Sequence, residues 1–87
     1  MGKYEVLLRQ SVLKKDLARM PKVAVRRIME TIRTLSDNPR PDGVRKLSGQ
    51  ERYRVRRGDY RIVFSIQDHA QTVWVVKVGH RRDVYRQ

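Results

Sequence analysis

The sequence has 87 residues, of which 21 are Lys or Arg and 9 are Asp or Glu, giving a formal net charge of +12. This length has room for one hydrophobic core, so we expect a single domain over residues 1–87. The absence of cysteine excludes a disulfide framework, a thiol nucleophile and a thiolate metal site. A chain this basic attracts polyanions, nucleic acid first among them, and acidic protein partners.

The N-terminal segment Met1–Glu5 lacks the apolar core of a signal peptide. No apolar run approaches the ~18 residues that a membrane span requires. We therefore expect a cytoplasmic protein that has no membrane partner.

The first half of the chain predicts a strand followed by two amphipathic helices. Tyr4–Arg9 is typical of a short strand, and Ser11 can cap the helix that follows by accepting a backbone N–H hydrogen bond. The apolar stripe of this first helix consists of Leu13, Leu17 and Met20. Pro21 either ends this helix or opens a second one over residues 22–35, where its missing N–H does no harm. The stripe of the second helix consists of Val25, Ile28, Ile32 and Leu35.

The second half predicts three strands. Turn formers dominate Asp37–Gly43 and end the helical part. Residues 52–57, 60–67 and 73–78 are rich in Tyr, Val, Ile, Phe and Trp, which suit a half-buried pleated surface. The predicted order is β-α-α-β-β-β. This order indicates an α+β fold, with a mostly antiparallel sheet, a helical hairpin on one face and the other face open.

A two-residue turn at Gly58-Asp59 fixes the register of the second and third strands. The apolar alternation then places one set of side chains in the core: Tyr53, Val55, Tyr60, Ile62, Phe64 and Ile66. Arg54, Arg56 and Arg61 fall on the open face, with Arg56 directly opposite Arg61. Such a like-charge pair destabilises a sheet unless an anion lies between the two. Arginine is well shaped to hold a phosphate.

The fourth strand allows two assignments of its faces. The more apolar set predicts that Trp74, Val76 and Val78 face the core. Val73, Val75, Lys77, Gly79 and Arg81 then share the open face with the arginines. A five-residue loop at Asp68–Thr72 places Arg61 opposite Gly79, where the missing side chain leaves room for a substrate backbone. A four-residue loop or a bulge would reverse this assignment.

The chemistry that these residues allow is metal-free RNA cleavage. His69 and His80 are too few and too separated in the sequence for a metal site, and no cofactor motif is present. RNA supplies its own nucleophile, the 2′-hydroxyl, and clustered arginines suit the charge on the transition state. Arginines are poor general bases, so the proton carriers are sought among His80, Asp83 and Tyr85.

Two segments resemble a known family. Residues 53–64 and 78–86 are similar to the signature of RelE-type toxins in the RelE/ParE superfamily, and Lys46-Leu47 before the second strand fits the same pattern. The resemblance implies a microbial-RNase-like fold and cleavage of mRNA in the A site of the 70S ribosome, without metal, by 2′-hydroxyl attack. It also implies an acidic, RelB-like antitoxin as partner.

The resemblance further implies roles for individual residues. The residues that hold the scissile phosphate correspond to Arg54, Arg56, Arg61 and Arg81. Tyr85 is the favoured general base and His80 the second candidate. Further RNA contacts are expected from Lys46, Arg52, Lys77 and Arg82, and contacts with ribosomal RNA from Lys14, Lys15, Arg26 and Arg27.

This chain departs from the family at Arg54 and Arg56, where the best-known members carry lysines. A lysine of lowered pKa carries protons and an arginine hardly does, which moves the base role towards Tyr85 or His80. A rival interpretation is a ParE-like toxin that inhibits DNA gyrase by binding. A third is a toxin that has lost its activity and only binds RNA or antitoxin.

Overall fold

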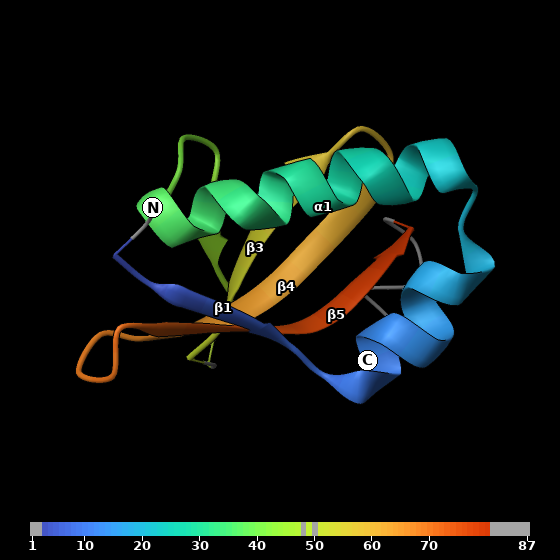
Figure 1. The fold of residues 1–87 in the computed structure, drawn as a ribbon. Coiled ribbons are helices and arrows are strands. Elements are labelled where there is room, and N and C mark those ends of the chain that lie inside the picture. Colours follow the sequence, from blue (N-terminus) through green and yellow to red (C-terminus); the bar gives the residue numbers. More distant parts are fainter. Residues whose placement is uncertain (1–2, 48, 50, 81–87) are drawn as a thin grey trace.

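Five strands form one mixed sheet, with the long helix α1 crossing one of its faces (Figure 1). The structure is a computed structural model, and it describes residues 3–47, 49 and 51–80. The elements are, in chain order, β1 (Glu5–Leu8), the short helices η1 (Val12–Asp16) and η2 (Leu17–Arg19), α1 (Lys22–Asp37), β2 (Arg45–Lys46), β3 (Tyr53–Arg57), β4 (Tyr60–Gln67) and β5 (Thr72–His80). None of the described helices is long and apolar enough to cross a membrane.

The sheet confirms the predicted α+β class but is larger than predicted. Its strand order is β1-β5-β4-β3-β2, with β1 parallel to β5 and the other neighbours antiparallel. The sequence predicted four strands, because β2 has only two residues and shows no periodicity. The first and last strands therefore lie side by side, and β4 is the central strand.

Helix α1 provides much of the core, as its apolar stripe predicted. Ile28, Ile32 and Leu35 are all buried and belong to one cluster with Phe64 of β4. Val25 packs at the margin of the same cluster. The opposite side of α1 is exposed, because arginines and other polar residues occupy it.

The predicted first α-helix is instead a π-helical turn, η1, followed by the 3₁₀ turn η2. The Ser11 side chain makes no capping hydrogen bond. Hydrogen bonds between residues i and i+5 widen η1, so Val12 and Leu17 both face the core. Leu13, predicted to be part of the stripe, is 53% exposed. The prediction assumed a spacing of 3.6 residues per turn, which this segment does not follow.

The β3–β4 hairpin has the predicted register. Arg56 is paired with Arg61, and Val55 with Ile62. Gly58 has φ +60, as the first central position of a type II′ turn requires. The predicted core set of these strands all lies in or against the main core.

The β4–β5 hairpin corrects the predicted faces of β5. Gln67 pairs with Thr72, so the loop has four residues, 68–71, instead of five. Val63 pairs with Lys77 and Phe64 with Val75, which leaves Val76 as an extra residue in a β-bulge.

The shorter loop reverses the predicted faces of β5 before the bulge, and the bulge restores them after it. Val73 and Val75 are fully buried in the main core, whereas Trp74 and Val76 pack with Val63 on the opposite face. The assignment of Trp74 and Val76 to the core is therefore wrong. The shorter loop and the bulge shift the register in opposite directions and cancel, so Arg61 still lies opposite Gly79 as predicted.

Candidate nucleic-acid interface

Four arginines gather on the face of the sheet opposite α1. Arg45 of β2 is paired with Arg54 of β3, and Arg56 of β3 is paired with Arg61 of β4. Paired residues in neighbouring antiparallel strands point to the same side, and residues two apart in one strand do so as well. These four side chains line one hollow of about 520 Å³, which we call the arginine pocket. Asp42, Gly43 and Val55 complete its wall.

The arginines differ in how far they reach solvent. Arg45 and Arg56 are exposed and Arg54 is half-buried. Arg61 lies on the central strand between Arg56 and Gly79, and it is only 6% exposed. Arg61 therefore lies on the predicted face of the sheet but is buried there. Because guanidinium groups stay charged at physiological pH, the pocket concentrates positive charge at the sheet surface.

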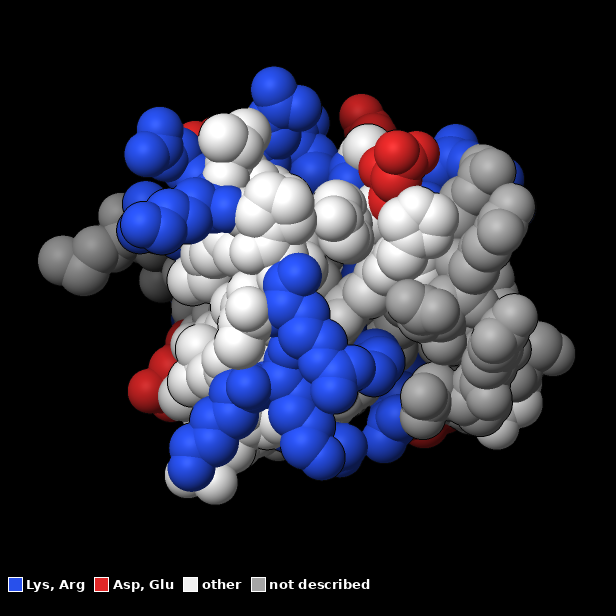
Figure 2. Space-filling model, turned by 90° about the vertical axis from the view of Figure 1, so that its right-hand side faces the viewer, with Lys and Arg blue, Asp and Glu red and all other residues white. Residues whose placement is uncertain are grey.

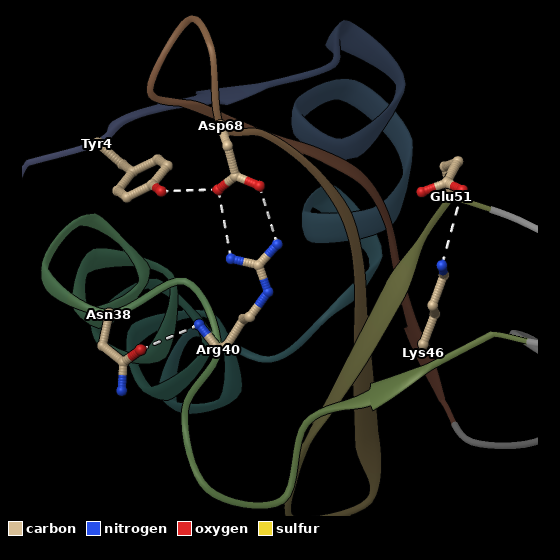
Figure 3. A network of polar contacts seen from close by, with 6 residues as sticks. All are labelled: Tyr4, Asn38, Arg40, Lys46, Glu51 and Asp68. Atoms are coloured by element: carbon tan, nitrogen blue, oxygen red, sulfur yellow. Dashed lines mark hydrogen bonds and ion pairs between the residues drawn. The ribbon is translucent and has the colours of Figure 1, made fainter.

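Arg45 lines the pocket although the sequence did not predict it. The neighbouring Lys46 was predicted to contact RNA instead. Lys46 pairs with Tyr53, so it projects to the other side of the sheet from Arg45. Its Nζ lies 3.6 Å from Oε1 of Glu51, and Figure 3 shows this ion pair. Since β2 has two residues, no periodicity was present that could tell Arg45 from Lys46.

Lys77 was also expected beside the arginines, but its amine is held elsewhere. Lys77 Nζ lies 3.3 Å from Oδ1 of Asp16, and the Asp16 side chain is only 9% exposed. The other oxygen of Asp16 accepts a hydrogen bond from the backbone N–H of Val78 at 3.0 Å. Strand β1 ends at Leu8, opposite Val75, so Asp16 supplies the acceptor that β1 no longer offers to β5.

His80 lies on the helix side of the sheet. It is paired with Tyr60, a residue that packs against the main core, and the two rings meet edge to face at a centroid distance of 6.0 Å. Gly79, one residue earlier, faces Arg61 on the other side. The structure therefore does not bring His80, the second candidate for the general base, to the arginine pocket. Arg81, Arg82, Asp83 and Tyr85 lie outside the described residues.

The remaining predicted RNA contacts lie in two places. Lys14 and Lys15 of η1 and Arg26 and Arg27 of α1 are exposed. Figure 2 shows Lys and Arg side chains gathered over the end of the molecule that carries η1 and η2. Arg52 is half-buried and lines a second hollow with Trp74. Within the described part of the chain, no three His, Cys, Asp or Glu side chains lie close enough to bind a metal ion.

Comparison with known proteins places this fold in a family. The model of the family described as "ParE toxin of type II toxin-antitoxin system, parDE" matches residues 7–85. The putative toxin RelE1 of Methanocaldococcus jannaschii is 30% identical over 88 residues, covering 97% of each chain. Toxin RelG of Mycobacterium tuberculosis is 43% identical over 42 residues, covering 48% of this chain and 46% of that toxin.

Solved structures of RelE toxins share the fold. The RelE–RelB complex of Pyrococcus horikoshii matches with a TM-score of 0.80 and 32% identity, covering 91% of this chain and 96% of that one. The RelBE2 toxin–antitoxin complex of M. tuberculosis also matches with a TM-score of 0.80, at 27% identity, covering 93% and 94%. The chain therefore belongs to the RelE/ParE superfamily and is a toxin of the RelE family of type II toxin–antitoxin systems.

Proposed function

We propose that this toxin is an endoribonuclease that cuts mRNA in the ribosomal A site. The observation that carries the proposal is the arginine pocket, in which four guanidinium groups converge on one hollow of the sheet. Two pairs of arginines face each other across neighbouring strands, Arg45 with Arg54 and Arg56 with Arg61. Within each pair the two positive charges repel each other. A phosphate between them turns this repulsion into attraction, because each guanidinium offers paired N–H donors to phosphate oxygens.

The reaction that this pocket suits needs no group other than RNA and protein. The 2′-hydroxyl oxygen attacks the neighbouring phosphorus, the bond from phosphorus to the 5′-oxygen breaks, and the products are a 2′,3′-cyclic phosphate and a 5′-hydroxyl. One proton leaves the attacking hydroxyl and one is delivered to the departing oxygen. Arg54, Arg56 and Arg61, with Arg81, hold the phosphate and stabilise the added negative charge of the transition state.

Tyr85 is the proposed general base. An arginine keeps its proton at neutral pH, so the four arginines of the pocket do not supply a general base. His80, the other candidate, lies on the helix side of the sheet beside Tyr60. Positive charge around a phenol favours the phenolate, which is the form that accepts a proton.

Basic residues on the surface bind the ribosome. Lys14, Lys15, Arg26 and Arg27, which are exposed, dock on ribosomal RNA, and Arg52 and Arg82 contact the mRNA. An acidic, RelB-like antitoxin opposes the activity, as the complexes of the related toxins with RelB suggest.

A second candidate function is inhibition of DNA gyrase by binding. The matching family model carries the ParE description, which favours it. Against it, a toxin that acts by binding alone does not need four converging arginines with a glycine opposite the buried one.

Mapping of mRNA ends by primer extension in a translation reaction tests the proposal. Wild-type toxin is expected to give discrete cuts that depend on the ribosome, and the Tyr85→Phe variant is expected to lose them. Intact mRNA together with inhibited DNA supercoiling would establish the gyrase function instead.

A further inference from the structure

Trp74 lies on the same face of the sheet as the arginine pocket. Its indole is half-buried and packs over Val63 and Val76, which are 4% and 7% exposed. Leu47 also packs against this small apolar cluster of Val63 and Val76. No described helix packs on this side, since the buried residues of η1, η2 and α1 all belong to the main core. An aromatic ring is therefore presented at the surface of the sheet.

Cationic and polar side chains surround this ring. A hollow of about 460 Å³ is lined by Arg9, Arg52, Ser65, Gln67, Trp74 and Val76. The two arginines flank different strands, β1 and β3, with β5 and β4 between them. Arg9 follows β1, and its backbone N–H donates to Val75 O at 3.1 Å. Arg52 precedes β3, and its carbonyl accepts the N–H of Leu47 at 2.8 Å.

The hollow and the arginine pocket lie on the same face of the sheet. Arg61 and Ser65 lie on β4 four residues apart and on the same face, which corresponds to about 13 Å. Arg52 and Arg54 are likewise neighbours on one side of β3. A single strand of RNA whose phosphate lies at Arg61 therefore has its neighbouring nucleotides within reach of Trp74.

We infer that Trp74 is a stacking site for a nucleobase of the bound RNA, one or two nucleotides from the phosphate held in the arginine pocket. This inference rests on the proposed ribonuclease function and extends it to a second subsite. Arg9 and Arg52 hold the phosphates on either side of the stacked base. Ser65 and Gln67 offer hydrogen-bonding groups to its edge, the means by which proteins read unstacked bases in RNA. The four-residue loop before β5 pairs Trp74 with Ser65 and so brings Trp74 to this face, ahead of the bulge at Val76.

Trp74 is the one tryptophan of the sequence, so its fluorescence reports on the subsite directly. The probe is a ten-nucleotide single-stranded RNA with 2′-O-methyl groups, which block cleavage. RNA binding is measured separately by the anisotropy of a dye at the RNA end. We expect saturable quenching of the Trp74 emission, with the same dissociation constant as the anisotropy titration gives.

A series of these RNAs, each lacking one base at a successive position, tests stacking without altering the protein. We expect one position at which loss of the base weakens binding about five-fold or more. Trp74→Leu should weaken binding of the intact RNA to the same extent and should be insensitive to that base deletion. Trp74→Phe, which keeps an aromatic ring, should retain most of the affinity. Circular dichroism checks that both variants fold.

Several outcomes separate this inference from the function on which it rests. RNA binding by anisotropy with unchanged Trp74 emission, and with no position sensitive to base loss, would overturn the stacking site and leave the ribonuclease proposal intact. An emission change caused by the cognate antitoxin and not by RNA would overturn it too, and would make this face a protein-docking surface. Failure to bind RNA at 50 mM salt by either signal would overturn the stacking site, whereas the ribosome-dependent cleavage is tested separately by primer extension in the translation reaction.

Discussion

Arg40 and Asp68 form a bidentate ion pair that joins the loop after α1 to the loop between β4 and β5. The guanidinium nitrogens Nη1 and Nη2 of Arg40 lie 3.3 and 3.1 Å from the two carboxylate oxygens of Asp68. The Tyr4 hydroxyl donates to Asp68 Oδ1 at 2.7 Å, and Asn38 Oδ1 accepts from the backbone N–H of Arg40 (Figure 3). Asp68 thus connects three segments that are far apart in the sequence.

This contact predicts an acid-dependent loss of stability. The Arg40 guanidinium, helped by the Tyr4 hydroxyl, lowers the pKa of the Asp68 carboxyl below its ordinary value of 3.8. A lowered folded-state pKa stabilises the fold above the ordinary value, and this contribution is lost as the pH falls through the folded-state pKa. Asp68→Asn should therefore lower the melting temperature slightly at pH 7, and the difference from wild type should shrink as the pH falls below 3.8 and vanish below the folded-state pKa.

Thermal unfolding followed by circular dichroism at a series of pH values measures this effect. Asp42→Asn is a suitable control, because Asp42 is exposed and carries no ion pair among those found in the described chain. An equal difference between Asp68→Asn and wild type at every pH would contradict the electrostatic explanation.

Arg61→Ala should reduce the single-turnover rate of mRNA cleavage by more than ten-fold, since it removes a charged donor from the phosphate. Arg57→Ala is the matched control: Arg57 lies in the same hairpin but pairs with Tyr60, on the other side of the sheet. It should cleave at nearly the wild-type rate. A folded Arg61→Ala protein with unreduced cleavage would refute the role of Arg61.

Arg45→Gln should weaken RNA binding at low salt and reduce its salt dependence. Loss of one phosphate contact on a single strand lowers the slope of log affinity against log salt concentration by about 0.7. Lys46→Gln should leave the slope unchanged, because Lys46 projects to the other side of the sheet and lies near Glu51. Anisotropy titrations at four or five salt concentrations distinguish the two neighbours. Equal effects of both substitutions would mean that the RNA does not distinguish the two faces of β2.

Asp16→Ala should destabilise the fold, because it leaves the Val78 N–H and the Lys77 amine without their acceptor at a buried position. The expected loss is about 1–3 kcal/mol, seen as a lower midpoint in urea unfolding. Asp16→Asn keeps an oxygen for the Val78 N–H and should lose less. Similar stability of the alanine variant and the wild type would show that water replaces the carboxylate at no cost.

The sequence was most informative where spacing alone determines geometry. A two-residue turn leaves one register for the β3–β4 hairpin, so the face shared by Arg54, Arg56 and Arg61 could be predicted and is confirmed. The stripe of α1 was equally clear, because the helix has a regular period.

Other parts depend on contacts between distant residues. The pairing of β1 with β5 joins the two ends of the described chain, and no local pattern encodes it. The four-residue loop before β5 reverses the predicted faces up to the bulge at Val76, and neither glycine nor proline marks that bulge. Arg45 could not be recognised, because its orientation is set by its pairing with Arg54 across a strand of two residues.

The position of β5 has a consequence for synthesis of the toxin. Strand β1 is made first, yet in the sheet it contacts β5, which is the last described strand to be made. Until β5 leaves the ribosomal tunnel, β1 has no partner and β4 has one unpaired edge. Pairings between residues so far apart in sequence also slow folding. The nascent chain therefore completes this sheet only after β5 has been made and has left the tunnel, so the ribosome meets the finished sheet no earlier than that.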